Sequence, residues 1–377
     1  MNFIRHTNAV NQLYSNLDNL INNNTFYNKK VYMFGSSVIA NMIIHYLKKN
    51  KIELAGILDN NPNRVGQKVF GLSIFSPKIL SDFTDDNVLV LIASGFQDAM
   101  IEQLENMGYI YEKHILKVID LPKLMSDYSF VDRTGYIPLS NEEIKQSQLN
   151  VLRKAKQICE ENGLRYYLAY GTLLGAVRHK GYIPWDDDID IYIPAKDMKK
   201  FIEKVNADKN FGIVSSFIEM DYYNNYSMMY DCNNICDSNH FPMQITAGIT
   251  IDIFPLFGLP DDKEKTESYL IELKEAEANM INLLYDTDKC NAARKKLFEL
   301  VNKYDFDQSP YTGNLFEHEI FSSDWFKEGS DVLFENEKFK APKEADKYLK
   351  AYFGNYWELP PVEKRVGHHF FNAYHQK

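Results

Sequence analysis

The sequence predicts an α/β protein of two domains. A parallel sheet with helices is expected first, followed by an α+β domain with helical additions at its C-terminal end. Three observations support this prediction. The chain has 377 residues, enough for two hydrophobic cores. Strand and helix patterns alternate over its first part. Aspartates then interrupt an apolar strand pattern between Asp186 and Asp190.

The composition excludes several classes of protein. Hydrophobic residues make up 45% and charged residues 25%, as in ordinary globular proteins. A net charge of −10 argues against a broad nucleic-acid surface. No segment approaches the roughly 20 apolar residues of a membrane span, and the N-terminus has no signal-peptide pattern. We therefore expect a cytoplasmic protein, for which peripheral membrane association stays open.

The four cysteines do not predict a disulfide framework, because no secretion signal accompanies them. Cys232 and Cys236, with His240 nearby, offer only part of a zinc site. No second pair supplies the remaining ligands, so reduced thiols are expected.

The N-terminal part has the order strand, glycine turn, helix, strand, acid. The turn is Gly35-Ser36-Ser37, and Asp59 ends the second strand. This order is typical of the first half of a Rossmann-type nucleotide-binding unit. The expected elements are a helix over 1–28, a strand over 30–34, a helix over 38–47, strands over 54–58 and 88–93, and a helix over 97–107.

Two features of this part bear on its ligand. A GxGxxG fingerprint starting at Gly35 would need glycines where Ser37 and Ala40 stand. The stretch ILDNNPNRVGQKVFG resembles the nucleotide-sugar-binding front domain of sugar acyltransferases. A scaffold role, nucleotide or sugar-nucleotide binding at Gly35, Ser36, Ser37 and Asp59, and redox chemistry all remain open.

The periodicity fades between about Leu121 and Ser140, where we expect the domain boundary. The predicted domains are residues 1–125 and 140–377. Ser140 is a predicted N-cap and Gly163 a C-cap of the helix that opens the second domain. A short apolar strand from Tyr166 to Tyr170 should follow and break at a Gly171-Thr172 turn, where backbone N–H groups could approach a phosphate.

The acidic window Asp186–Asp190 is the sharpest feature of the chain. On a strand, Asp188 and Asp190 project from one face, while Ile189 and Ile191 enter the core. Two adjacent carboxylates repel each other unless a cation neutralises them, and Mg²⁺ or Mn²⁺ prefers oxygen ligands. Asp252 lies on a second predicted strand over 249–255 and points away from Ile251 and Ile253.

The stretch GTLLGAVRHKGYIPWDDDIDI resembles the hallmark of the LicD family, which includes the fukutin-type proteins. The tail from Phe334 to His369 is similar to the same family's pattern, with Asn355 where an acid usually stands. Together the resemblance covers about residues 141–370. It implies a nucleotidyltransferase fold and transfer of a phospho-alcohol, such as phosphocholine or ribitol phosphate, from a CDP-activated donor to a glycan hydroxyl, releasing CMP. The glycan would belong to a bacterial capsule, lipopolysaccharide or teichoic acid.

The resemblance also suggests roles for individual residues. Asp188, Asp190 and Asp252 would be the catalytic, metal-binding acids, with Asp252 as a third ligand or as the base for the acceptor hydroxyl. Trp185 either stacks on a base or a quaternary ammonium, or anchors its loop. The residues expected to bind the donor or its phosphates are Gly171, Thr172, Arg178, Lys180, Asp186, Asp187, Arg365, His368 and His369.

Two other functions compete with phospho-alcohol transfer. A catalytically silent domain could serve as a scaffold for glycan synthesis, although Asp188, Asp190 and Asp252 are all present. A cytidylyltransferase could instead make the CDP-activated donor from CTP. Released CMP, released pyrophosphate or no release would separate the three.

Overall fold

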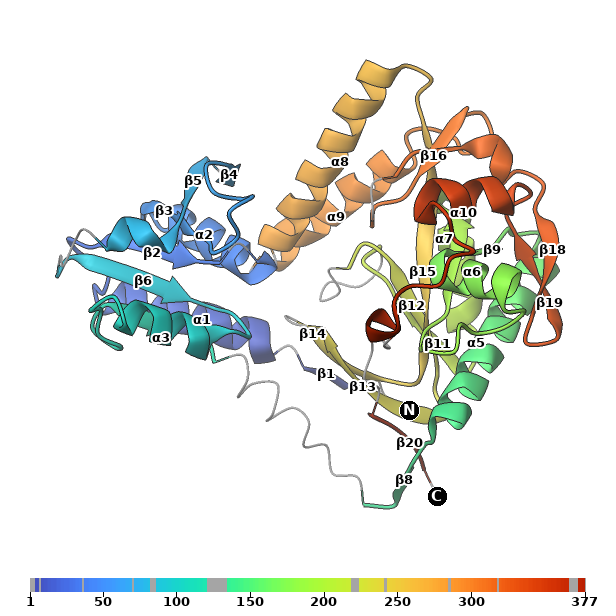
Figure 1. Ribbon diagram of the computed structural model, residues 1–377, viewed down its shortest axis with the longest axis horizontal. Coiled ribbons are helices and arrows are strands. Elements are labelled where there is room, and N and C mark those ends of the chain that lie inside the picture. Colours follow the sequence, from blue (N-terminus) through green and yellow to red (C-terminus); the bar gives the residue numbers. More distant parts are fainter. Residues whose placement is uncertain are drawn as a thin grey trace.

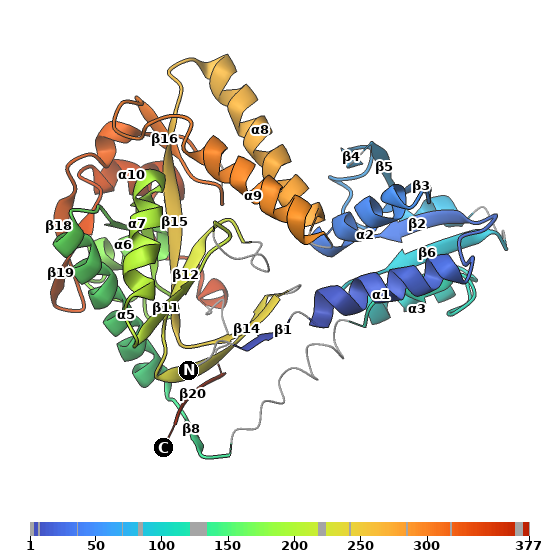
Figure 2. The same ribbon diagram turned by 180° about the vertical axis from the view of Figure 1, so that it is seen from behind.

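The computed structural model describes residues 4–6, 8–35, 37–69, 71–81, 86–120, 134–217, 224–240, 243–283, 286–316, 319–365 and 372–376. The protein is mixed α/β and contains parallel strands, as the sequence predicts. Figure 1 shows the N-terminal sheet and its helices at one end of the molecule and the acid-bearing sheet at the other. The view from behind shows the same separation (Figure 2).

The N-terminal sheet has the strand order β4-β5-β3-β2-β6-β7, in which β5, β3, β2, β6 and β7 are parallel. The predicted strands appear as β2 (Lys30–Phe34), β3 (Leu54–Leu58) and β6 (Val88–Ile92). The other elements of this part are α1 (Asn8–Asn22), α2 (Val38–Lys49), β4 (Lys68–Val69), β5 (Leu72–Phe75), η1 (Pro77–Leu80), α3 (Gln97–Glu105) and β7 (Ile115–Lys117).

Both faces of this sheet are buried. Val31 and Met33 of β2 lie in one core with residues of α1 and α2, whereas Tyr32 and Phe34 lie in another with Leu104 of α3. The alternation follows from the pleat of a strand, which sends successive side chains to opposite faces. Near-continuous apolar strands are therefore what a parallel sheet with helices on both faces requires.

The second large sheet carries the acidic window and has the order β11-β12-β15-β10-β9. Strands β10 and β15 are parallel, and their neighbours β9 and β12 run antiparallel to them. Residues of α5, α6 and α7 pack on this sheet in one hydrophobic core. The elements are α5 (Asn141–Asn162), β9 (Tyr167–Leu168), α6 (Tyr170–Arg178), β10 (Asp190–Pro194), α7 (Ala195–Asn206), β11 (Phe211–Val214), β12 (Ser227–Asp231) and β15 (Thr250–Leu259).

Helix α5 is capped at both ends as predicted. The Ser140 hydroxyl accepts a hydrogen bond from the Glu143 backbone N–H, and the Glu143 carboxylate accepts one from the Ser140 N–H. This reciprocal pair is a capping box. Gly163 ends the helix in the left-handed conformation, with φ of 65°.

The expected strand from Tyr166 to Tyr170 is shorter than predicted. Only Tyr167 and Leu168 pair with β10, and α6 begins at Tyr170. Tyr170 has φ of 38°, which turns the chain sharply from strand to helix. Gly171 and Thr172 therefore lie in the first turn of α6 and not in a loop. The reversal at Tyr170 is a tertiary feature, because its ring is held by Phe254 and Tyr352 at centroid distances of 5.1 Å each.

The remaining elements extend the second part. A smaller sheet has the order β1-β14-β13-β20-β8, so the first described strand pairs with β14 far along the chain. Helix α8 reaches back and contacts α2, and Ile281 near its end packs on the N-terminal core. These elements are β1 (Ile4–His6), β8 (Tyr136–Pro138), β13 (Asn234–His240), β14 (Met243–Ala247), α8 (Lys263–Asn282), α9 (Thr287–Val301), β16 (Tyr311–Gly313), β17 (Phe321–Ser322), η2 (Ser323–Trp325), β18 (Ser330–Phe334), β19 (Glu337–Ala341), α10 (Ala345–Phe353), η3 (Val362–Lys364) and β20 (Asn372–Gln376).

Candidate active site

A cleft of about 900 Å³ opens beside the amino ends of β10 and β15. Its size is within the usual range of small-molecule sites. Four aspartates lie on its walls together with Gly171, Arg178 and Trp185. The aspartates are Asp186, Asp188, Asp190 and Asp252.

The pairing of β10 with β15 brings the separate acids together. Asp190 and Asp252 are register partners on the two parallel strands, and the Asp252 backbone N–H donates to the Ile189 carbonyl at 2.8 Å. Ile189 and Ile191 are fully buried, as the alternation predicts. Asp188 lies two residues before Asp190, in the segment that leads into β10, and its side chain reaches the same cleft.

Burial and mutual repulsion disfavour ionisation of these acids. Asp190 is 8% exposed, and burial, followed by the charges of Asp188, Asp252 and Asp186, raises its pKa well above the ordinary value. Burial and Asp188 also raise the pKa of Asp252. The pKa of Asp186 rises to about 7, chiefly through burial and then through Asp188. Such a cluster fits a bound divalent cation, which would favour the ionised carboxylates.

The carboxylates of Asp186, Asp187 and Asp188 come closest together. One oxygen of each lies within 4.8 Å of the others, the only such grouping of acids, histidines and cysteines in the described residues. Asp187 does not line the cleft. The acids suited to a metal thus include Asp186 and Asp187 beside the set expected from the sequence.

The first turn of α6 meets the acids directly. A Cβ atom at Gly171 would lie 2.7 Å from an Asp186 carboxylate oxygen, so this position admits only glycine without a shift. The Thr172 side chain is 2% exposed, and its hydroxyl accepts from the Asp190 backbone N–H at 2.8 Å. Thr172 therefore fixes the start of β10, while Gly171 presents the helix N-terminus to the cleft.

The basic residues expected to bind the donor differ in whether they reach the cleft. Arg178 lines the cleft and donates to the Tyr356 carbonyl at 2.5 Å. Lys180 is exposed and donates to the Val177 carbonyl at the end of α6; it does not line the cleft. Arg365 donates to the Pro360 carbonyl, and its guanidinium lies 5.3 Å from the centre of the Trp185 ring. His368 and His369 lie outside the described residues.

An aromatic wall closes one side of the cleft. We use this name for Tyr170, Tyr226, Phe254, Phe316 and Tyr352, all of which line it. Phe254 lies 5.0 Å from Tyr226 and 5.2 Å from Phe316, between ring centroids. The sequence around these aromatic residues carries no sign of the cleft. Only the pairing of β12 with β15 brings them to it.

The candidate residues of the N-terminal sheet are engaged locally. Gly35 has φ of 94°, which a side chain would strain. The Ser37 hydroxyl caps α2 by accepting from the Ala40 N–H. Asp59 accepts from the Asn61 N–H and faces the Arg64 guanidinium at 3.6 Å. Ser36 lies outside the described residues.

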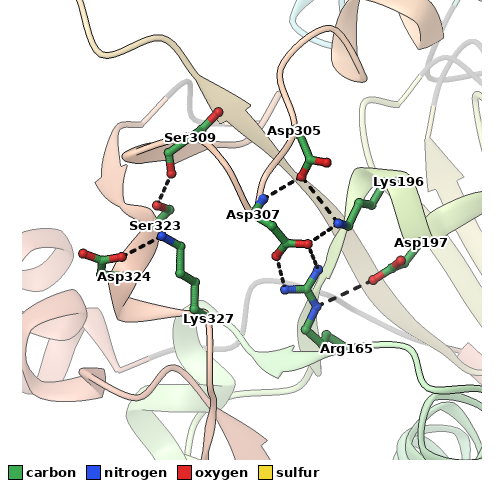
Figure 3. A network of polar contacts seen from close by, with 9 residues as sticks. All are labelled: Arg165, Lys196, Asp197, Asp305, Asp307, Ser309, Ser323, Asp324 and Lys327. Carbon is green, nitrogen blue, oxygen red and sulfur yellow. Dashed lines mark hydrogen bonds and ion pairs between the residues drawn. The ribbon is translucent and has the colours of Figure 1, made fainter.

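A second group of acids lies beyond the carboxyl end of β10 (Figure 3). Asp307 forms ion pairs with Arg165, at 2.5 Å, and with Lys196. Asp305 pairs with Lys196 at 3.4 Å. Burial raises the pKa of Asp307, but hydrogen bonds from Arg165 and Lys196 outweigh it, so the net shift is downward. This network ties the start of α7 to the segment after α9.

The chain is similar to known proteins. Residues 163–282 match the family described as LicD/FKTN/FKRP, nucleotidyltransferase domain, and residues 27–116 match the one described as C2185-like, N-terminal. Over 255 residues the chain is 25% identical to the lipopolysaccharide cholinephosphotransferase LicD of Haemophilus influenzae, covering 60% of this chain and 94% of that protein.

Shorter matches occur in other organisms. The ribitol 5-phosphate transferase FKRP of Homo sapiens is 49% identical over 41 residues, which are 11% of this chain and 8% of that protein. The uncharacterized protein RP689 of Rickettsia prowazekii is 30% identical over 111 residues, 27% of this chain and 38% of that protein. No helix among the described residues is both long and apolar enough to cross a membrane.

Proposed function

Since the chain carries a LicD/FKTN/FKRP nucleotidyltransferase domain and is a LicD-type transferase, we propose the following reaction. A phospho-alcohol passes from a CDP-activated donor to a hydroxyl of a cell-surface glycan, and CMP is released. The observation that carries this proposal is the gathering of Asp186, Asp188, Asp190 and Asp252 in one cleft beside the N-terminus of α6. The donor's phosphates and the acids would meet there.

The acids would hold Mg²⁺ or Mn²⁺. Asp188, Asp190 and Asp252 are the proposed ligands, and the raised pKa values of Asp190 and Asp252 support a site that needs a cation to keep both charged. When bound, the metal would neutralise the donor's phosphates and acidify the attacking hydroxyl. Thr172 contributes by holding the Asp190 backbone in place.

Helix α6 would bind the donor's diphosphate. Backbone N–H groups in a helix's first turn have no partner within the helix and attract anions. The missing side chain of Gly171 leaves room for a close approach, and Arg178 is the one Lys or Arg among the described residues that line the cleft. We propose that Gly171 and Arg178 contact the diphosphate, and that the head group extends towards the segment Asp186–Asp188.

The acceptor hydroxyl would enter from the open side of the same cleft. In-line displacement needs the acceptor oxygen and the leaving CMP on opposite sides of the transferred phosphorus. The relatives named above act on lipopolysaccharide or transfer ribitol 5-phosphate, by their names, which supports a glycan acceptor. Phosphocholine and ribitol phosphate are the two head groups that these names suggest.

CMP release tests the proposal. Purified protein is incubated with CDP-choline, CDP-ribitol, CDP-glycerol or CDP-ethanolamine, a glycan acceptor and Mg²⁺, and CMP is quantified. Metal-dependent CMP release with one donor, lost in Asp190→Asn, is the expected result. Pyrophosphate from CTP would identify a cytidylyltransferase instead. No turnover with any donor or with CTP, in protein that is folded, would favour a scaffold.

The N-terminal part remains a separate proposal. We propose that residues 1–125 and 140–377 form two domains, because the strands of their large sheets lie in different hydrophobic cores, with Ile281 of α8 and the pairing of β1 with β14 as contacts between them. A nucleotide or sugar nucleotide would bind at the Gly35 turn and Asp59. Thermal shift with UDP-sugars, compared between the wild type and Asp59→Asn, tests this; an equal shift in both would exclude Asp59 as a contact.

A further inference from the structure

A buried amide on α5 touches the acidic segment from behind. Gln148 is 0% exposed. Its Nε2 donates to the Asp187 backbone carbonyl at 2.8 Å, and its Oε1 lies 3.2 Å from the Tyr182 hydroxyl, whose single proton it shares with the Lys145 carbonyl. Both hydrogen-bonding ends of one side chain are thus used on two residues that flank Asp186.

Tyr182 is itself held from two sides. Its hydroxyl also lies 3.0 Å from the Lys145 carbonyl of α5, and its backbone N–H donates to a Glu335 carboxylate oxygen at 3.0 Å. The Glu335 N–H in turn donates to the Lys180 carbonyl at 3.0 Å. Tyr182 is therefore fixed by α5 on one side and by the turn between β18 and β19 on the other, four residues before Asp186. Gln148 connects that fixed point to Asp187.

We infer that Gln148 is a positioning residue that sets the metal affinity of the proposed active site. The inference rests on the proposed function, because it assumes that the acids bind a divalent cation. Three successive carboxylates, Asp186, Asp187 and Asp188, repel one another. The hydrogen bond from Gln148 to the Asp187 backbone carbonyl opposes the separation of these residues when no cation is present. It thereby holds Asp188, the proposed ligand among the three, where it lines the cleft with Asp190 and Asp252.

The chemistry of an amide suits this position. The Asp187 carbonyl accepts a hydrogen bond, and the Tyr182 hydroxyl meets a second acceptor beside the Lys145 carbonyl, so a glutamine side chain serves both residues at once. An ionised carboxylate supplies no donor, and a thioether supplies neither strongly. Groups behind metal ligands typically change metal affinity by about 10–100-fold when they are removed.

Gln148→Met tests the inference, because methionine has a similar length and no hydrogen-bonding amide. We expect Mn²⁺ binding, measured by isothermal titration calorimetry without substrate, to weaken about tenfold. The KM for Mg²⁺ in CMP release should rise by the same factor, while the KM for the CDP donor at saturating Mg²⁺ stays within about twofold. The matched control is Gln157→Met on the exposed side of α5, where Gln157 donates to Glu161 and accepts from Lys154, both on the same helix and away from the cleft. It should leave all three quantities unchanged.

A milder variant protects the test against misfolding. Tyr182→Phe keeps the ring and removes the hydroxyl beside the Gln148 oxygen, so Mn²⁺ binding should weaken in the same direction but less than in Gln148→Met. If Gln148→Met folds and binds Mn²⁺ as tightly as the wild type, the positioning role is overturned. CMP release by the wild type would still support the proposed function in that case. If Gln148→Met does not fold, wild-type affinity in Tyr182→Phe overturns the inference. A wild-type protein that binds no Mn²⁺ overturns it together with the metal site.

Discussion

The two ends of β10 carry acids in opposite electrostatic states. At its amino end, Asp190 is buried among Asp186, Asp188 and Asp252, and both its burial and these neighbouring charges raise its pKa. Beyond its carboxyl end, Asp307 lies between Arg165 and Lys196, which lower its pKa despite partial burial. Both places gather aspartates, but hydrogen bonds from basic side chains lower the pKa of Asp307, whereas burial and neighbouring acids raise that of Asp190.

The difference separates a structural acid from a functional candidate. Asp307 uses its charge within the fold, since it ties α7 to the segment after α9 (Figure 3). Asp190 in its ionised form makes the fold less stable, because a buried charge beside like charges is unfavourable. A protein keeps such a cluster where a ligand compensates for it, and perturbed carboxylates in a cleft often mark active sites.

The largest effect should come from Asp190→Asn and Asp252→Asn. Each removes a proposed metal-binding charge, so we expect CMP release to fall at least about 10³-fold. Asp307→Asn at the other end of β10 should keep kcat within about twofold, measured at saturating Mg²⁺ and donor. Near wild-type turnover in Asp190→Asn would remove the metal assignment, and a comparable loss in Asp307→Asn would erase the distinction between the two ends.

Gly171→Ala should have the next largest effect. The added Cβ would lie 2.7 Å from an Asp186 oxygen and must displace that carboxylate or the first turn of α6. A displacement near 1 Å can lower turnover by about 10²-fold. Gly95→Ala is the control, because its Cβ would meet no atom within 4 Å and its φ needs no glycine. Equal kcat/KM in the two variants would contradict the close approach of Asp186 to α6.

Arg178→Ala should cost less than the acids. A charge-assisted hydrogen bond to a phosphate contributes about 2 kcal/mol, so kcat/KM for the CDP donor should fall by tens-fold. Lys180→Ala should change it by less than about threefold, because Lys180 points to the end of α6 and not into the cleft. A larger loss of kcat/KM for the CDP donor in Lys180→Ala than in Arg178→Ala would mean that Lys180, and not Arg178, contacts the diphosphate.

The sequence could predict the local features of this site but not its assembly. Alternation at Ile189 and Ile191 predicted which way Asp188 and Asp190 point, and Ser140 and Gly163 predicted both ends of α5. The reversal at Tyr170 could not be predicted, because aromatic rings from distant elements hold it. Nor could the sequence predict that Arg178 lines the cleft and Lys180 does not, because the difference depends on where α6 ends. The bridging amide of Gln148 lies 39 residues before its partner Asp187, so no local pattern connects the two.

A smaller effect is expected on stability in the absence of metal. Burial and neighbours raise the pKa of Asp186 to about 7. A raised folded-state pKa stabilises the fold below the unfolded pKa, and this contribution is lost as pH rises towards about 7. In EDTA, Tm should therefore fall by about 2–4 °C between pH 5.5 and 8, and less in Asp186→Asn. Asp307→Asn should keep the wild-type slope. Differential scanning fluorimetry measures these Tm values. An equal fall of Tm in Asp186→Asn and in the wild type would contradict the raised pKa of Asp186.

The smallest effect should come from Asp59→Asn in the N-terminal sheet. Asp59 resembles Asp307 more than Asp190, because it faces Arg64 at 3.6 Å and accepts from the Asn61 N–H. It ends β3 on a different sheet from the cleft acids. We therefore expect kcat and KM for CMP release to stay within about twofold, while Asp190→Asn in the same assay is inactive. A loss of fivefold or more, in protein with wild-type Tm, would mean that the N-terminal sheet takes part in the transfer. A basic partner would then not distinguish a structural aspartate from a functional one in this chain.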